Sequence, residues 1–182
     1  MSFKRWDLVA VCLFGIGIVL GFTVPVGIAD FLAEDLAAIE ELAAFLGPFQ
    51  VSTAVFIFSK NISALLFSFI FSPILCLFPV IALLVNGWLL AFVSSLVVQE
   101  KSLGFVLAAL LPHGIFEIPA LIIGEAAALS FGAMALMALL SKEKRNLLLP
   151  NLKQNARYLM VAGILLVPAA IIETYITPLF LT

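Results

Sequence analysis

The feature that most constrains this chain is the length of its apolar segments. Four segments, 8–28, 49–98, 103–140 and 158–180, contain few charged residues. Each is long enough to cross the hydrocarbon core of a bilayer, which is roughly 30 Å thick and needs about 20 residues of helix. Composition agrees, because the chain of 182 residues is 64% hydrophobic and only 11% charged. The sequence therefore predicts an all-α membrane protein that forms a single integral membrane domain, 1–182.

An acidic stretch follows the first apolar segment, which we interpret as a retained span rather than a cleaved signal peptide. Asp30 stands where a helix N-cap is expected, and apolar residues then recur with helical spacing as far as Gly47-Pro48. This pattern predicts an amphipathic helix at 30–47. Two interpretations of it remain open: it packs across the bundle, or it provides a docking face for a partner.

The segment 49–98 is long enough for two spans and can be divided in two ways. The simpler division places a tight turn at Ser72-Pro73 between two spans, and it puts Lys60 near mid-membrane at a cost of at least ~2.5 kcal/mol. The alternative makes 62–85 one proline-kinked span and leaves 87–98 as a re-entrant piece. We favour the division into two spans.

The segment 103–140 is too long for one upright helix and contains Pro112, Gly114 and Pro119 near its middle. Proline removes a backbone donor and bends or ends a helix. We therefore predict a helix break at these three residues, with a short half-helix 103–111 before it and a longer helix as far as Leu140. The expected form is a broken or re-entrant helix within a bundle of about five spans.

Basic residues predict the orientation. Seven of the nine Lys and Arg lie in the N-terminal tail or in the connecting segment 141–157, whereas 30–41 holds five acids and no base. Basic segments tend to stay in the cytoplasm. We expect a multi-pass protein of the cell membrane, with a cytoplasmic N-terminus and an extracytoplasmic C-terminus and 30–47 helix.

Polar side chains inside the apolar segments mark a candidate site, because each is costly to expose to lipid. His113 and Glu117 are four residues apart, so on a helix they share a face. Glu173 lies in the last apolar segment, and we predict that the three converge in one buried polar site. A structural hydrogen bond, a proton relay and a binding site for an ion or solute all remain open; Glu125 is a further carboxylate not assigned to the site. The predicted intramembrane polar site consists of His113, Glu117, Glu173, Asn86, Asn61 and Lys60.

Catalysis is not expected. The chain has a single histidine, so it has no H-E-x-x-H motif, and it also lacks G-x-S-x-G, Walker and G-x-G-x-x-G motifs. We predict no enzyme, no cofactor and no metal site. The net charge of -2, without an extended basic face, argues against a nucleic-acid partner.

Small residues predict close helix contacts. Gly15, Gly17 and Gly21 form a pattern that lets two membrane helices approach, and we expect it to support a homo-oligomer. Asn86-Gly87 predicts a second close approach. The expected partners are membrane lipids, further copies of the chain, and proteins within the membrane or outside the cytoplasm.

The stretch Leu111-Pro112-His113-Gly114-Ile115-Phe116-Glu117-Ile118-Pro119-Ala120 resembles the LPHG-x-x-E-x-x-A signature of the stage II sporulation protein M family. Asn61, Asn86-Gly87 and the stretch 172–178 are similar to further family positions, although Lys60 stands where the family often has a first Asn. The resemblance implies a multi-spanning α-helical fold and a scaffold that assembles peptidoglycan-remodelling partners. It supplies no catalytic residues.

Two functions therefore stay open. A scaffold or membrane-remodelling protein would use its polar cluster to fix its shape. A transporter or channel subunit would use the same cluster to bind a proton, an ion or a small solute. A wet cavity that reaches His113 and Glu117 favours transport, whereas a dry and fully hydrogen-bonded cluster favours the scaffold.

Overall fold

The computed structural model describes residues 3–23 and 47–180. The predicted amphipathic helix 30–47 lies, except for Gly47, outside these residues. The described part is helical and contains no strand, which confirms the predicted all-α class. Its elements are α1 (Phe3–Thr23), α4 (Val51–Phe71), α5 (Leu77–Glu100), α6 (Leu103–Leu140), the 3-10 helix η1 (Lys142–Leu147), α7 (Leu148–Tyr175) and the 3-10 helix η2 (Thr177–Phe180).

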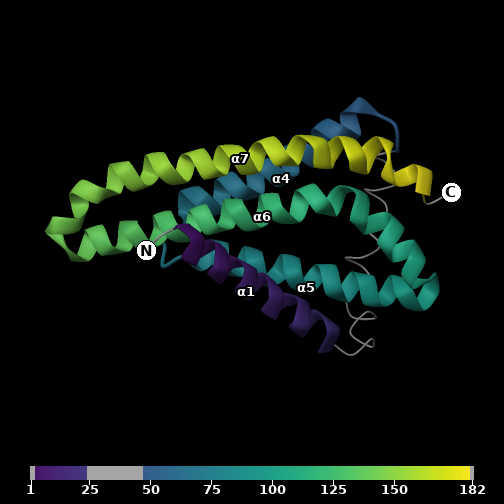
Figure 1. The fold of residues 1–182 in the computed structure, drawn as a ribbon, viewed down its shortest axis with the longest axis horizontal. Helices are drawn as coiled ribbons and strands as arrows, with labels where there is room; N and C mark the ends of the chain where they lie inside the picture. Colours follow the sequence, from purple (N-terminus) through teal and green to yellow (C-terminus); the bar gives the residue numbers. More distant parts are fainter. Residues whose placement is uncertain (1–2, 24–46, 181–182) are drawn as a thin grey trace.

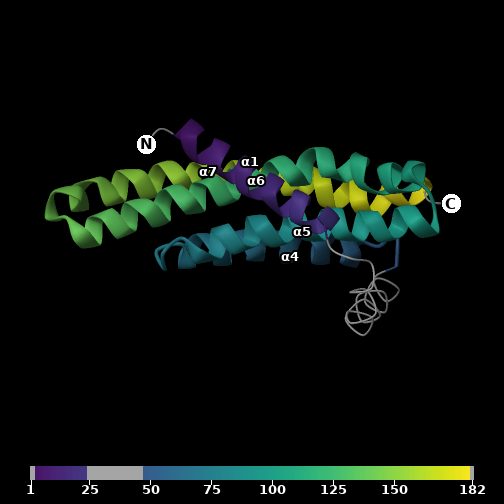
Figure 2. The same cartoon turned by 90° about the horizontal axis from the view of Figure 1, so that it is seen from below.

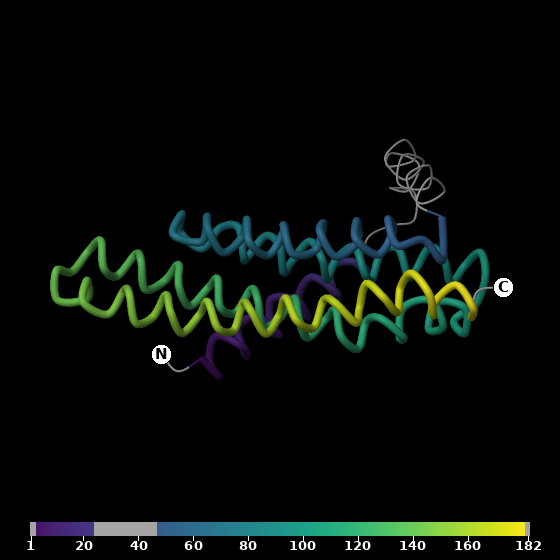
Figure 3. The backbone as a smooth tube through the Cα atoms, turned by 90° about the horizontal axis from the view of Figure 1, so that it is seen from above, coloured from purple at the N-terminus to yellow at the C-terminus, as the bar shows by residue number. Residues whose placement is uncertain are grey.

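Within the described residues, five helical stretches are long and apolar enough to cross a membrane, as predicted. They are α1, α4, α5, α6 and the combined stretch of η1 and α7. Figures 1 and 3 show the N-terminal end of α1, the turn between α4 and α5, and η1 towards one end of the molecule. The C-terminus and the turn between α5 and α6 lie at the other end. The elements thus alternate in direction as five crossings require.

The segment 49–98 forms two spans, which confirms the favoured division and shows that the re-entrant alternative is wrong. The chain turns between α4 and α5 through residues 72–76. Leu75 and Cys76 adopt positive φ angles of 53° and 55° there. The Ser72 hydroxyl donates a hydrogen bond to the Phe69 carbonyl oxygen at 2.8 Å, so the end of α4 is closed by its own chain.

Helix α6 corrects the predicted break. It is one continuous helix of 38 residues with Pro112 and Pro119 inside it. Each proline removes only one hydrogen bond and pushes on the preceding turn, which bends a helix that is held on both sides by packing. Figure 1 shows α6 curving in its first third rather than ending there. The helix is neither interrupted nor re-entrant.

The basic segment 141–157 also differs from the expected loop, because it is helical in η1 and the first turns of α7. Helices α6 and α7 form a long hairpin that extends past the ends of α4 and α5 (Figures 1 and 2). At about 1.5 Å per residue, the 38 residues of α6 measure roughly 57 Å, well beyond a core of roughly 30 Å. The tip of the hairpin therefore extends outside the hydrocarbon core.

Helix α6 is the common element of both apolar cores. One core joins α4, α6 and α7 through residues such as Leu65, Ala128 and Leu166. The other joins α1, α5 and α6 through residues such as Phe14 and Leu83. Side chains of α6 that lie between the two cores are therefore packed against helices on both sides.

Glycines allow α1 to pack closely on α5. A Cβ atom added to Gly17 would lie 2.3 Å from the Leu84 carbonyl oxygen, and one added to Gly87 would lie 2.3 Å from that of Phe14. Gly87 thus makes the close contact that the sequence predicts. A Cβ atom added to Gly21 would likewise collide with the backbone of α5, whereas one added to Gly15 would meet nothing within 4 Å. Most of the glycine row that motivated the predicted homo-oligomer is therefore used inside the chain.

Candidate functional site

Three of the predicted polar residues converge on one point between α6 and α7. His113 and Glu117 occupy successive turns of α6, with 3.9 Å between His113 Nε2 and Glu117 Oε2. Glu173 reaches the same point from α7. One nitrogen or oxygen ligand atom from each of the three lies within 4.8 Å of the others. The bend of α6 does not separate His113 from Glu117, because the helix stays continuous through both.

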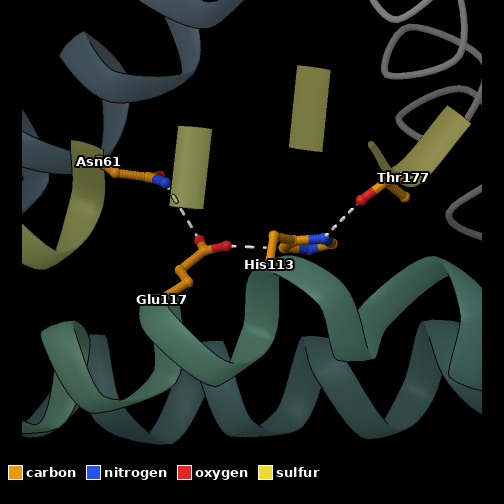
Figure 4. Close-up of polar contacts among 4 residues, drawn as sticks. All are labelled: Asn61, His113, Glu117 and Thr177. Atoms are coloured by element: carbon orange, nitrogen blue, oxygen red, sulfur yellow. Dashed lines mark hydrogen bonds and ion pairs between the residues drawn. The ribbon is translucent and has the colours of Figure 1, made fainter. Parts of the chain in front are cut away.

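Two of these side chains, those of His113 and Glu117, also contact residues of other elements (Figure 4). Asn61 of α4 donates a hydrogen bond from Nδ2 to Glu117 Oε1 at 3.1 Å. Thr177 of η2 places its hydroxyl oxygen 3.4 Å from His113 Nδ1. Each contact fixes one atom of its partner and leaves the other, His113 Nε2 or Glu117 Oε2, directed towards the convergence point.

Thr177 was not among the predicted site residues. It lies 64 residues from His113 in the chain, and a contact at that separation depends on how α7 packs against α6. The one signal that points to it is its position within 172–178, the stretch that carries part of the family resemblance.

A cavity opens onto the convergence point. Its volume is about 300 Å³, and the polar residues that line it are His113, Glu117, Glu173 and Asn86, with apolar side chains from α1, α5 and α6 around them. A water molecule occupies about 30 Å³ in the liquid. The cavity therefore has room for several waters or a small solute. In the side chains of His113 and Glu117, 13% and 35% of the surface stays exposed.

A second and smaller cavity lies beside the first and shares lining residues with it. It measures about 70 Å³ and is lined by Asn61, Asn86, Glu117 and Glu125 among others. Asn86 and Glu117 line both cavities. Glu125 is 1% exposed and accepts a hydrogen bond from the Ser68 hydroxyl. Polar groups thus extend along α6 from the convergence point to Glu125, which the sequence marks as intramembrane but does not assign to the site.

The remaining predicted residues take different positions. Asn86 faces both cavities while its amide donates a hydrogen bond to the Ala82 carbonyl at 2.7 Å. Lys60 has an exposed side chain and lines neither cavity. Within the described residues it forms no salt bridge. The structure therefore gathers His113, Glu117, Glu173, Asn86 and Asn61, and leaves Lys60 at the edge.

The charges at the convergence point determine its chemistry. Two carboxylates, Glu117 and Glu173, lie close together inside a helical membrane bundle, where charge is poorly screened. Like charges at such a distance favour a shared proton or a cation between them. Within the described residues Glu173 has no hydrogen-bond partner, so its carboxylate remains available to a ligand. The arrangement is suited to binding a proton or a cation.

No solved structure matches this chain. An uncharacterised protein of Methanocaldococcus jannaschii is 34% identical over 99 residues, which are 54% of this chain and 56% of that protein. The chain thus aligns with little more than half of that relative. The family model described as stage II sporulation protein M matches residues 10–178, a range that includes every residue of the two cavities. This chain belongs to the stage II sporulation protein M family.

Proposed function

We propose that this protein is a transport or channel subunit that binds a proton, a cation or a small solute in the cavity beside His113 and Glu117. The observation that carries the proposal is the cavity of about 300 Å³ that opens onto two carboxylates and an imidazole inside the bundle. A cluster with a purely structural role would have its polar groups paired and its volume filled. Here Glu173 lacks a hydrogen bond within the described residues, and space remains beside it.

Glu117 has the central role in this proposal. It lines both cavities, contacts His113 and accepts a hydrogen bond from Asn61. A proton or cation bound at the convergence point therefore affects the same carboxylate that lines the smaller cavity together with Glu125. Ionisable groups in such a row are typical of relays in membrane proteins. We assign no catalytic step to any of these residues.

A pathway across the whole membrane needs more protein than one chain provides. The two cavities lie beside α6 and do not themselves define a route from one face to the other. We propose that further copies of the chain complete it. Helices α1, α4, α5 and α7 all have exposed apolar side chains on which such a partner or lipid would pack.

A second candidate function is a scaffold or membrane-remodelling component. It is favoured by the α6–α7 hairpin, which extends past the other helices and has exposed basic residues at its tip (Figure 3). A hairpin of this kind would hold a protein partner outside the bilayer. In that case the polar residues of α6 and α7 would serve to fix the packing of the two helices.

Replacement of Glu117 separates the two candidates. In Glu117→Gln the amide oxygen keeps the hydrogen bond from Asn61, so we expect a nearly unchanged melting temperature in detergent. In Glu117→Ala the Asn61 amide loses its partner, which costs about 1–3 kcal/mol of stability. For a transport site, both variants lose proton or cation flux into liposomes, because neither has a carboxylate.

The matched control is Glu143→Gln, which removes an exposed carboxylate of η1 and is expected to leave both flux and melting temperature unchanged. Wild-type protein that carries no proton, cation or solute into liposomes would contradict the transport proposal. If stability then follows the order wild type, Glu117→Gln, Glu117→Ala, the scaffold is favoured.

A further inference from the structure

The convergence point has the composition of a metal site. We propose that His113, Glu117 and Glu173 bind a first-row transition-metal dication, such as Zn²⁺ or Mn²⁺. This inference rests on the proposed cation site and names the class of cation that it takes. It goes beyond the sequence, which predicts no metal site because no metal-binding motif brings these residues together along the chain.

The distances are close to those of a coordinated ion. Metal-to-ligand distances of about 2.0–2.2 Å place neighbouring ligand atoms of one ion roughly 3–4 Å apart. His113 Nε2 and Glu117 Oε2 are 3.9 Å apart, and one ligand atom of Glu173 completes a group in which all lie within 4.8 Å. The adjacent cavity gives these side chains room to rotate inwards, and it has space for water as a further ligand.

Two of the three ligands are already oriented by other residues. If the Thr177 hydroxyl accepts a hydrogen bond from the protonated Nδ1 of His113, the lone pair of Nε2 faces Glu117. Asn61 occupies Oε1 of Glu117 and leaves Oε2 free. Metal-binding imidazoles and carboxylates are commonly held in this way by a second group. The contacts from Thr177 and Asn61 therefore orient two of the three ligands before any metal binds.

The ligand types select the class of ion. Imidazole favours transition metals, whereas Ca²⁺ and Mg²⁺ prefer oxygen ligands alone. A dication between two carboxylates also gives a neutral site, which costs least inside a membrane bundle. A monovalent ion would leave one net negative charge on the two carboxylates.

The single histidine of the chain allows a direct test on the unaltered protein. Full-length protein is purified through a tag without histidine, stripped with a chelator and loaded with Zn²⁺ alone. X-ray absorption at the zinc edge then detects imidazole scattering only if His113 is a ligand. We expect imidazole together with oxygen ligands. Protein that binds no zinc, or zinc without imidazole scattering, would overturn the inference.

Variants test the other ligands by calorimetry with Zn²⁺ and Mn²⁺. We expect affinity to fall by more than about 10-fold in His113→Gln and Glu173→Gln, and by roughly 10-fold to 100-fold in Thr177→Val, which removes an orienting group. Glu143→Gln is the control, because it removes an exposed carboxylate of η1 and should leave the affinity unchanged. Equal affinities in wild type, His113→Gln and Glu173→Gln would show that the metal binds elsewhere. If these variants do not fold, the absorption measurement on wild type decides.

The measurement of metal binding and the measurement of flux test the two proposals separately. Zinc bound through imidazole, without flux of any cation in liposomes, would support the metal site and contradict the transport proposal. Proton flux through protein that binds neither Zn²⁺ nor Mn²⁺ would support transport and overturn the metal site.

Discussion

At the scale of single residues, the most enclosed ionisable side chain in the described part of the chain is Glu125 rather than a member of the predicted site. It is 1% exposed, and within the described residues its hydrogen-bond partner is the Ser68 hydroxyl. A buried polar group stabilises the fold only while its partner is present. The pair therefore joins α4 to α6 next to the smaller cavity.

Removal of this partner tests how much the pair contributes. Ser68→Ala leaves the Glu125 carboxyl without its hydrogen bond, and we expect a loss of about 1–3 kcal/mol of stability, measured as a lower melting temperature in detergent. The control is Ser63→Ala on the same helix, where the side chain is exposed. Equal melting temperatures in the two variants would show that the pair adds no stability.

Only some residues of the site could be predicted from the sequence. The convergence of His113, Glu117 and Glu173 was predictable, because each is costly to expose to lipid and helical spacing fixes the first two. Thr177 was not predictable, because its contact depends on the packing of η2 against α6. Lys60 lines neither cavity, which the sequence did not indicate, since an apolar segment does not reveal which face of its helix meets lipid.

At the scale of elements, glycines let the backbones of α1 and α5 lie close together. Carbonyl oxygens of one helix fill the space where side chains of Gly17, Gly21 and Gly87 would stand. The sequence pattern predicts close approach but does not identify the partner helix, so the row was assigned to a homo-oligomer. The structure gives α5 of the same chain as the partner.

Two variants of α1 test this contact. A side chain at Gly17 would collide with the Leu84 backbone, so we expect Gly17→Val to lower stability by about 1–3 kcal/mol or more. Gly15→Val is the matched control, because nothing lies within 4 Å of the added Cβ. Melting temperatures in detergent compare the two. A similar effect of both would mean that α1 does not pack on α5 through Gly17.

Helix α6 shows the same limit of prediction for the backbone. The prolines were correctly expected to disturb the helix, because proline lacks a donor. Whether a helix bends or stops at a proline depends on the packing around it, and α6 is held by two apolar cores. The local sequence shows that a proline is present, but it does not show how the helix around that proline is packed.

At the scale of the whole molecule, the number of spans followed from the lengths of the apolar segments. The structure adds that the basic N-terminal residues and η1 lie towards the same end, with the C-terminus at the other (Figure 1). Which end faces the cytoplasm stays a prediction from charge, which places the basic end inside.

Cysteine labelling in cells tests this orientation. In a background without Cys12 and Cys76, an impermeant maleimide should label Ser102→Cys, in the turn between α5 and α6, from outside intact cells. Glu143→Cys in η1 should react only after the cytoplasmic side is opened, because the positive residues around it resist translocation. Labelling of the two positions in the reverse order would invert the topology.

The length of α6 has a mechanical consequence. The helix bears His113 and Glu117 near one end and reaches the exposed, basic tip of the hairpin at the other, at least 23 residues or roughly 35 Å away. Because α6 is one continuous helix, a displacement of its tip is passed along it to the proline-bent end that bears His113 and Glu117. A force on the tip from outside the bilayer would change the spacing of the polar residues, and a ligand between those residues would in turn shift the tip. The two ends of one helix thus join the bilayer interior to whatever binds the tip.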